Sequence, residues 1–173
     1  MNVDRIKAAI RDVPDFPKPG ILFKDITPVL GDPTLFRMAV DWMAEQCRAA
    51  GVRKVAAIEA RGFFFAGAVC DRLGLGLVPI RKQGKLPYRT FEETYALEYG
   101  SATLAIHRDA LVPGEPVALM DDLLATGGTA AAAARLIEQA GGRVVQVLFL
   151  IELAFLNGRA KLKDYPVSVP VVF

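Results

Sequence analysis

The sequence predicts an α/β protein in which helices flank a twisted, mostly parallel central sheet. Short apolar runs, which are typical of strands buried on both faces, alternate along the chain with helical patterns. The run at 117–120 also ends in two adjacent carboxylates, Asp121 and Asp122, before a Gly- and Thr-rich turn and an Ala-rich helical pattern. Ligands of open α/β sheets bind at such junctions between a strand end and a helix start. We therefore expect a binding site around residues 121–129.

Composition indicates one globular domain over residues 1–173. The chain is 53% hydrophobic and 23% charged, and its formal net charge of +2 argues against a large nucleic-acid surface. Cys47 and Cys70 have no metal-ligand spacing, and we expect reduced core thiols. No signal peptide pattern follows Met1, and no apolar run approaches the roughly 18 residues of a membrane span. We therefore expect a soluble, cytoplasmic protein with no membrane partner.

The N-terminal region combines helical patterns with a proline-rich segment. Apolar residues recur at helical spacing over 4–13, which predicts a short amphipathic helix. Residues 15–28 are apolar and stiffened by proline but follow neither helical nor strand periodicity. Two interpretations are open: a packed N-terminal arm, or a lid over a flat ligand against which Phe23 stacks. A helix over 33–50 follows, with Trp42 on its core-facing side.

Two strand ends carry candidate anion-binding groups. Strand 55–58 leads through the turn 59–62, where an arginine lies beside a glycine, into a helix over 63–73. A guanidinium next to free backbone N–H groups suits a diphosphate, although a surface arginine beside a turn glycine fits the pattern equally well. Strand 77–80 leads into three cations within residues 81–85, which are either a second anion site or a solvated charge run.

The middle of the chain predicts a β-ribbon. Residues 87–94 have little apolar periodicity and are expected to form a mobile excursion. Alternating patterns over 95–99 and 103–107, separated by a Gly-Ser pair, then predict two antiparallel strands. His107, the single histidine, has no metal-ligand partner at useful spacing and is expected on the surface of this ribbon.

The C-terminal third repeats the strand–helix alternation. Strand 117–120 precedes a helix over 130–140 that ends at a glycine pair. A continuous apolar run at 144–151 predicts a buried parallel strand, and 167–172 predicts the last one.

The residues after strand 117–120 suit a phosphorylated ribose. Motifs of the forms G-x-x-x-x-G-K-[ST], G-x-G-x-x-G and G-x-S-x-G are absent from the sequence. Backbone N–H groups and hydroxyls of residues 126–129 can enclose a phosphate at a helix N-terminus. Asp121 and Asp122 would repel that phosphate directly but suit a neighbouring diol or a hydrated Mg²⁺. A diphosphate would be bound beyond them by the cations Arg61, Lys82 and Lys85.

These residues resemble a known family. Segment 117–129 resembles the phosphoribosyl-diphosphate signature of type I phosphoribosyltransferases. Three further segments, 15–26, 59–63, and 81–87 leading to 97–100, are similar to the adenine phosphoribosyltransferases within that family, occur in the same order and cover nearly the whole chain. The resemblance implies the type I phosphoribosyltransferase fold with a small N-terminal hood, about residues 1–33, and a flexible β-ribbon loop, about residues 82–102.

The resemblance implies a reaction of purine salvage. The phosphoribosyl group would pass from phosphoribosyl diphosphate to adenine, giving AMP and diphosphate, in a homodimer. Mg²⁺ would be the cofactor without a dedicated protein site, held mainly by the diphosphate and ribose with Asp121 as a water-mediated contact.

The resemblance also implies roles for single residues. The 5′-phosphate would be bound by Ala125, Thr126, Gly127, Gly128 and Thr129. The diphosphate would be bound by Glu59, Ala60, Arg61, Gly62, Arg81, Lys82 and Lys85, in a loop that often has a non-proline cis peptide. Adenine would be contacted by Leu22, Phe23 and Lys24, with main-chain hydrogen bonds at the first and third of these.

The implied mechanism is dissociative at C1′ of the ribose. The catalytic residues would be Glu98, Arg61, Asp121 and Asp122, with Glu98 as a hypothetical general acid/base at the purine and Tyr99 in loop closure. Departure of diphosphate would leave an oxocarbenium-like ribose, stabilised by preorganised charge and kept from water by the closed loop.

Two positions depart from the family pattern, and two other functions are alternatives. Tyr88 and Ala66 stand where members often have glycine, and the tyrosine puts loop mobility in question. One alternative is the same transfer to another purine, against which the segment around Phe23 argues. The other is a non-catalytic purine-sensing regulator, for which the small net charge and the lack of length for a helix-turn-helix offer no support.

Overall fold

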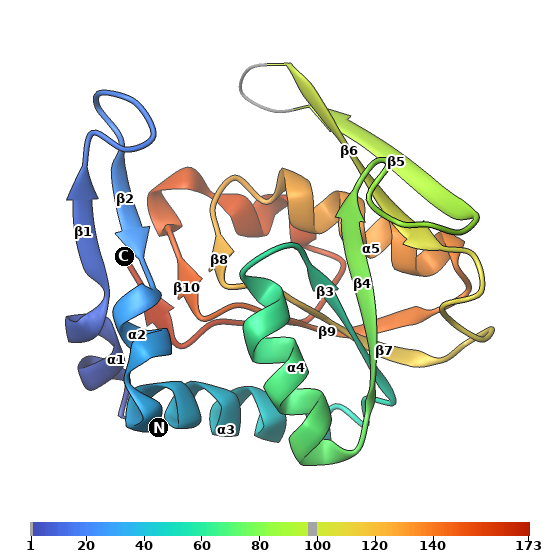
Figure 1. The fold of residues 1–173 in the computed structure, drawn as a ribbon, viewed down its shortest axis with the longest axis horizontal. Coiled ribbons are helices and arrows are strands. Elements are labelled where there is room, and N and C mark those ends of the chain that lie inside the picture. Colours follow the sequence, from blue (N-terminus) through green and yellow to red (C-terminus); the bar gives the residue numbers. More distant parts are fainter. Residues whose placement is uncertain (1, 97–99) are drawn as a thin grey trace.

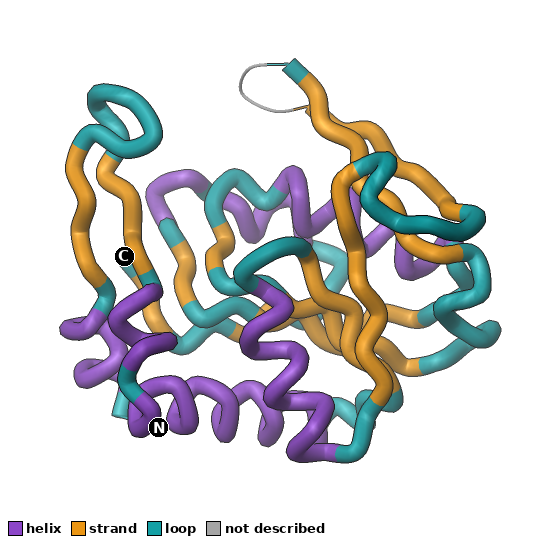
Figure 2. The backbone as a smooth tube through the Cα atoms, viewed as in Figure 1, coloured by secondary structure: helices purple, strands orange, loops and turns teal. Residues whose placement is uncertain are grey.

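A mixed seven-stranded sheet forms the centre of the computed structural model, which describes residues 2–96 and 100–173 (Figures 1 and 2). The strand order is β11-β9-β7-β3-β4-β6-β5. The first five strands of that order are parallel: β11 (Val167–Ser168), β9 (Arg143–Leu148), β7 (Pro116–Met120), β3 (Lys54–Ile58) and β4 (Gly76–Lys82). The last two are antiparallel: β6 (Ser101–His107) and β5 (Thr90–Ala96).

Helices cover both faces of this sheet. Helices α3 (Pro33–Ala49) and α4 (Gly62–Leu73) pack on one face, and α5 (Gly128–Gln139) packs on the other (Figure 1). Successive residues of β3 alternate between the two cores, since Val55 belongs to the α3–α4 side and Ala56 to the α5 side. The predicted α/β fold class is therefore confirmed.

The strand order reverses between β3 and β7, which lie side by side. From β3 the chain crosses through α4 to β4 on one side, and from β7 it crosses through α5 to β9 on the other. The loops that follow β3 and β7 therefore diverge and leave a crevice at the carboxyl ends of these strands, the usual ligand position in open α/β sheets. The sequence predicted this position from the acids that end the β7 run.

The N-terminal segment is a hairpin between two short helices. Helix α1 (Val3–Ala9) is followed by β1 (Arg11–Pro14), β2 (Leu22–Asp25) and α2 (Thr27–Gly31). The predicted helix over 4–13 is wrong beyond Ala9, because Arg11–Pro14 pairs antiparallel with Leu22–Asp25. The helical pattern at this end is weak, and pairing with β2 determines the conformation instead. The sequence of β2 has no strand periodicity from which this pairing could be predicted.

The ribbon begins earlier than predicted. Strand β5 pairs with β6 from Thr90 opposite His107 to Ala96 opposite Ser101, so the predicted excursion over 87–94 is wrong from Thr90 onward. Phe91 and Tyr95 of β5 pack against the α5 core. These two side chains form the apolar face of the strand, which the sequence pattern marks only weakly. The expected strand residues 97–99 lie outside the described part of the chain.

The last predicted strands are each divided between two sheets. A parallel three-stranded sheet, β12-β10-β8, consists of β12 (Val171–Val172), β10 (Ile151–Glu152) and β8 (Leu123–Leu124). The backbone N–H groups of Leu150 and Ile151 both donate to the Asp122 carbonyl, so the run after β9 bends toward the crevice. Two 3-10 helices, η1 (Ala154–Leu156) and η2 (Gly158–Leu162), connect β10 to β11.

Other expectations from the sequence also have an outcome. Cys47 and Cys70 are both free and buried, as predicted. Trp42 packs against the α3–α4 core, as expected. His107 lies on the ribbon strand β6, but its Nε2 atom is buried and has no hydrogen-bond partner among the described residues. Within residues 2–96 and 100–173, no helix is long and apolar enough to span a membrane.

Candidate active site

The crevice is built by two backbone segments that approach very closely. Gly62 opens α4 directly behind the end of β7, and a Cβ atom there would lie 2.8 Å from the Met120 carbonyl oxygen and 3.0 Å from Asp121 Oδ1. Only glycine fits this contact without a shift of the backbone. The close approach brings Arg61 against the acids, where its Nε donates to Asp122 Oδ2 at 2.5 Å.

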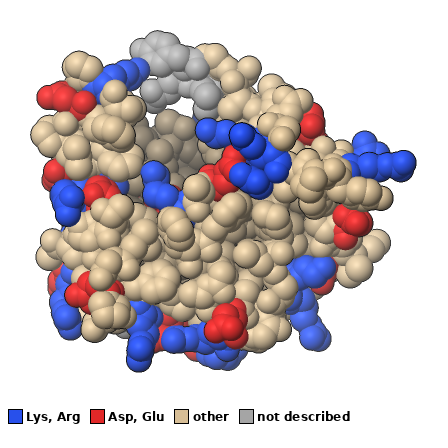
Figure 3. Space-filling view, in the orientation of Figure 1, with Lys and Arg blue, Asp and Glu red and all other residues tan. Residues whose placement is uncertain are grey.

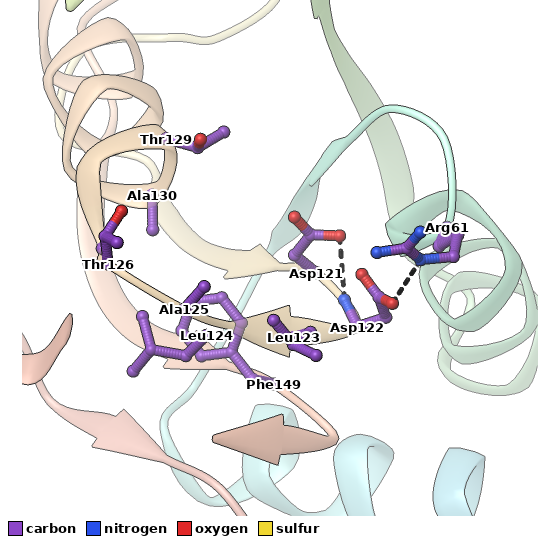
Figure 4. A pocket seen from close by; sticks show the side chains of 11 residues that line it. Arg61, Asp121, Asp122, Leu123, Leu124, Ala125, Thr126, Thr129, Ala130 and Phe149 are labelled. Carbon is purple, nitrogen blue, oxygen red and sulfur yellow. Dashed lines mark hydrogen bonds and ion pairs between the residues drawn. The ribbon is translucent and has the colours of Figure 1, made fainter. Parts of the chain in front are cut away.

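A cavity of about 200 Å³ lies between these segments and the start of α5 (Figure 4). Arg61, Asp121 and Asp122 lie at one end of it, and the hydroxyls of Thr126 and Thr129 lie toward the other. The remaining lining residues are Leu123, Leu124, Ala125, Gly127, Ala130 and Phe149. One open cavity therefore joins the acidic pair to the predicted phosphate turn.

The two acids differ in their surroundings. Asp122 is only 3% exposed, and Arg61 compensates its charge. Asp121 accepts a hydrogen bond from the Asp122 backbone N–H at 2.8 Å, but burial and the neighbouring Asp122 carboxylate raise its pKa well above the ordinary value. A hydroxyl donor or a cation that reached the Asp121 carboxylate would relieve this cost.

The phosphate turn presents unused backbone donors. Among the described residues, the N–H groups of Thr126, Gly127, Gly128 and Thr129 find no hydrogen-bond acceptor. Gly127 has a φ of +76°, and a Cβ there would lie 2.3 Å from the Gly158 carbonyl oxygen, so η2 packs directly beneath the turn. Free N–H groups at the start of α5, in a shape that requires glycine, are a ready-made site for an anion.

Glu59 organises the other strand end. The Glu59–Ala60 peptide bond is cis, as the family resemblance implied. Glu59 Oε2 accepts from Arg81 Nε at 2.7 Å and Oε1 accepts from the Lys82 backbone N–H at 2.9 Å. Burial opposes the ionised form, but these two hydrogen bonds and the nearby cations hold the pKa of Glu59 below its ordinary value. The Glu59 carboxylate therefore fixes the end of β4 to the end of β3.

Cations lie around the end of β4. Lys82 and Lys85 are exposed, and the Lys85 carbonyl accepts from Arg81 Nη1 at 3.0 Å. Lys and Arg side chains gather beside a hollow in this face of the molecule (Figure 3). The anion site predicted at 81–85 therefore remains a prediction, and its two lysines are exposed to solvent.

The N-terminal hairpin reaches the rim of the site. The Phe23 ring centroid lies 5.4 Å from Arg61 Cζ and 5.1 Å from the Phe16 ring centroid. The Lys24 ammonium is taken up elsewhere, by Asp12 at 2.5 Å and by the Phe173 ring at 4.0 Å. Residues 15–20 of this segment are exposed and Ile26 is buried, so only its second half packs against the rest of the molecule, where it brings the Phe23 ring next to Arg61. The interpretation of this segment as a lid stays a prediction.

Comparison with known proteins defines the family. Residues 31–170 match the family model for the phosphoribosyl transferase domain. The chain belongs to the phosphoribosyltransferase family. Among similar members, the adenine phosphoribosyltransferase of Nitrosococcus oceani is 53% identical over 95% of this chain and 96% of its own length.

Solved structures of phosphoribosyltransferases agree. The crystal structure of adenine phosphoribosyltransferase from Thermoanaerobacter pseudethanolicus matches 99% of this chain and 100% of its own, with a TM-score of 0.96 and 48% identity. The enzyme from Saccharomyces cerevisiae, crystallised with an imino-altritol bisphosphate and adenine, matches 97% of both chains with a TM-score of 0.92 and 39% identity. The predicted type I phosphoribosyltransferase fold is therefore confirmed.

The structure brings seven of the predicted site residues of this phosphoribosyltransferase around one cavity: Arg61, Asp121, Asp122, Ala125, Thr126, Gly127 and Thr129. The predicted adenine-binding residues 22–24 and the cations of 81–85 do not line it. The predicted residues Glu98 and Tyr99 lie outside the described part of the chain. The sequence reasoning missed four apolar lining residues and one hydroxyl that contacts the phosphate turn: Leu123, Leu124, Ala130, Phe149 and the hydroxyl of Tyr95.

A signal in the sequence could have found one of the missed residues. Phe149 follows directly after β9, at the same edge of the sheet as the acids that follow β7, so the strand-end rule that located those acids also applies to it. Tyr95 is different, because its contact with α5 depends on how the ribbon folds back.

The donor set fits a loosely held divalent cation. Within the described residues, no group of three or more His, Cys, Asp and Glu side chains is arranged to hold a metal ion. The Asp121 carboxylate faces the cavity, and the Arg61 side chain near it is hydrogen-bonded to Asp122. Mg²⁺ commonly binds one or two carboxylates plus substrate oxygens, and Asp121 could supply such a contact directly or through water.

Proposed function

We propose that this phosphoribosyltransferase transfers the phosphoribosyl group of phosphoribosyl diphosphate to adenine, giving AMP and diphosphate in purine salvage. The single observation that carries the proposal is the cavity that joins the phosphate turn, whose N–H groups have no acceptor among the described residues, to the Arg61–Asp122 pair, with Phe23 next to that arginine. Two relatives with solved structures, at 48% and 39% identity over nearly their full length, are adenine phosphoribosyltransferases.

Each half of the cavity suits one part of the donor. The backbone N–H groups of 126–129 and the hydroxyls of Thr126 and Thr129 would hold the 5′-phosphate, aided by the field of α5. Asp121 and Asp122 would accept hydrogen bonds from the two ribose hydroxyls. Arg61 would bind the diphosphate together with the turn 59–62 and with Arg81, Lys82 and Lys85.

The transfer would break the bond from C1′ to the diphosphate oxygen and form a bond from C1′ to a ring nitrogen of adenine. Arg61 would stabilise the negative charge that develops on the leaving diphosphate. When bound, Mg²⁺ would add charge neutralisation on the same group, with Asp121 as its protein contact. The nitrogen loses a proton as the new bond forms, and Glu98 is our hypothesis for the acceptor; near wild-type turnover in Glu98→Gln would contradict it.

The N-terminal hairpin would select the base. Because the Lys24 ammonium is engaged by Asp12 and Phe173, the backbone of Leu22 and Lys24 is what remains to hydrogen-bond the purine edge, with Phe23 against the ring. The competing functions are transfer to hypoxanthine or guanine, and purine sensing without turnover. Parallel turnover assays with adenine, hypoxanthine and guanine distinguish the proposed reaction from transfer to another purine. DNA binding in a gel-shift assay without turnover would support the purine-sensing function.

We also propose that the chain works as one domain with a hood of about residues 1–33 and a mobile loop of about residues 82–102, closed with the help of Tyr99. The protein would act in the cytoplasm as a homodimer, which sedimentation analysis tests. The decisive experiment for the reaction is mass-resolved AMP formation from adenine and phosphoribosyl diphosphate, with and without Mg²⁺. Absence of AMP in the presence of all three would overturn the proposal.

A further inference from the structure

The ribbon strand β5 lies along the helix that opens the phosphate turn. Glu93 accepts from Arg135 Nε at 2.6 Å and from Gln139 Nε2 at 3.3 Å, both on α5. Two residues on, the Tyr95 hydroxyl lies 3.0 Å from the Thr129 hydroxyl in the first turn of α5. The Tyr95 ring also faces Gly128, where a Cβ would lie 3.5 Å from its Cδ2 atom. A strand outside the cavity therefore contacts a residue that lines it.

The direction of the Tyr95–Thr129 hydrogen bond follows from the ligand. Either hydroxyl can be the donor in the protein alone. A phosphate dianion only accepts hydrogen bonds, and Thr129 has a single O–H to give. Once that O–H is donated to the phosphate, the Thr129 oxygen can only accept from Tyr95.

We propose that Tyr95 is a positioning residue of the phosphate turn, whose hydroxyl donates to Thr129 and directs the Thr129 O–H toward the bound 5′-phosphate. Without this donor, a threonine hydroxyl in the first helical turn is free to rotate toward nearby backbone groups. The chain of hydrogen bonds is also mutually polarising, so phosphate binding strengthens the Tyr95 contact and the contact strengthens phosphate binding. This inference rests on the proposed function, because that function places the phosphate at Thr129.

The variant Tyr95→Phe removes one oxygen and keeps the ring against Gly128. Loss of one hydrogen bond predicts a KM for phosphoribosyl diphosphate that rises by roughly 2- to 10-fold, while kcat and the KM for adenine change by less than about twofold. The matched control is Tyr165→Phe, which removes a hydroxyl bound to Glu138 at 3.1 Å near the other end of α5. This control should leave the KM for phosphoribosyl diphosphate unchanged.

A double-mutant cycle separates positioning from general loosening of the ribbon. If Tyr95 acts through Thr129, Tyr95→Phe has no further effect on that KM in a Thr129→Ala background. Full additivity of the two changes would overturn the proposal, and so would a KM in Tyr95→Phe equal to that of the wild type.

Binding of ribose 5-phosphate, measured by calorimetry, decides the inference independently of turnover. Tyr95→Phe should bind ribose 5-phosphate roughly 2- to 10-fold more weakly than wild type, whereas Tyr165→Phe should bind it equally well. Equal binding by Tyr95→Phe would overturn the role of Tyr95. If the wild type instead bound ribose 5-phosphate but made no AMP from adenine, the proposed function would fail while the Tyr95 comparison still gave its answer.

Discussion

Replacing Gly62 by alanine should impair the site far more than its single added methyl group suggests. The new Cβ would lie 2.8 Å from the Met120 carbonyl oxygen, 3.0 Å from Asp121 Oδ1 and 3.1 Å from Asp121 Cα. Ordinary van der Waals contact begins at 3.4 Å, so the ends of β3 and β7 must separate by several tenths of an ångström. Both neighbours at Asp121 are parts of the site, and the Met120 oxygen is backbone that cannot rotate away.

The expected cost has two parts. Overpacking of this kind typically destabilises by about 1–3 kcal/mol, which urea unfolding would measure. Displacement of a group that positions substrate by about 1 Å can lower the rate by about 10²-fold, so a shift of several tenths of an ångström predicts a fall in kcat/KM of roughly 10-fold or more. AMP formation from adenine and phosphoribosyl diphosphate is the assay.

Gly67 provides the matched control in the same helix. Apart from its own helix backbone and its chain neighbours, no atom of the described residues lies within 4 Å of a Cβ at this position, so Gly67→Ala meets no clash. Alanine is favoured over glycine inside a helix by about 0.5–1 kcal/mol, and Gly67→Ala should therefore be as stable as wild type or more so, with unchanged activity. A Gly62→Ala variant with wild-type kcat/KM and stability would refute the reasoning.

Three further predictions concern the glycine of the phosphate turn, a buried acid and a buried thiol. Gly127→Ala should lose activity and several kcal/mol of stability, because its Cβ would lie 2.3 Å from the Gly158 carbonyl oxygen. The control is Gly114→Ala, which has the same φ of +76° but no described atom within 4 Å of its Cβ, and which therefore isolates the cost of the backbone conformation. Equal losses of stability in the two variants would contradict the clash. Glu59 has a lowered pKa, so its stabilising charge is fully present above its ordinary value of 4.5 and is lost as pH falls through the lower folded value. The difference in free energy of unfolding between wild type and Glu59→Gln should therefore shrink on acidification, and a pH-independent difference would count against it. Burial raises the pKa of Cys47 to about 12, so iodoacetamide at pH 8 should modify this thiol only in denaturant, which intact-mass measurement checks. Labelling of Cys47 in the folded protein would show that its thiol is accessible.

Local order explains why the centre of the site could be predicted from the sequence. An apolar run, two acids, a glycine turn and a helix start are contiguous between residues 117 and 130, so their arrangement in space follows from strand and helix geometry alone. The same holds for the Arg61 turn after β3. That these two segments meet is a property of the strand order, which the α/β alternation predicts only as a class.

Contacts between distant segments explain what could not be predicted. Strand β1 depends on its pairing with Leu22–Asp25, and the early start of β5 depends on packing against α5. The division of the predicted strand 144–151 depends on the Asp122 carbonyl, which accepts two hydrogen bonds from the bend at Leu150. The partner of β1 is the next strand along the chain but has no strand pattern of its own, and the other two partners lie far away in the sequence, so no local pattern carries the information.

The pairing of Arg61 with Asp122 links the two halves of the proposed reaction. Among residues 2–96 and 100–173, Arg61 binds Asp122 through Nε alone, so its terminal guanidinium nitrogens could hold a diphosphate while the same side chain orients the acid. The Phe23 ring centroid lies 5.4 Å from Arg61 Cζ, so the hairpin that we propose to bind the base reaches the same guanidinium. A lysine has one point charge on a flexible stem and could not meet these three geometric demands together. Geometry more than charge therefore explains the arginine at this turn, and in the proposed reaction one planar group would connect the donor, the acid pair and the acceptor.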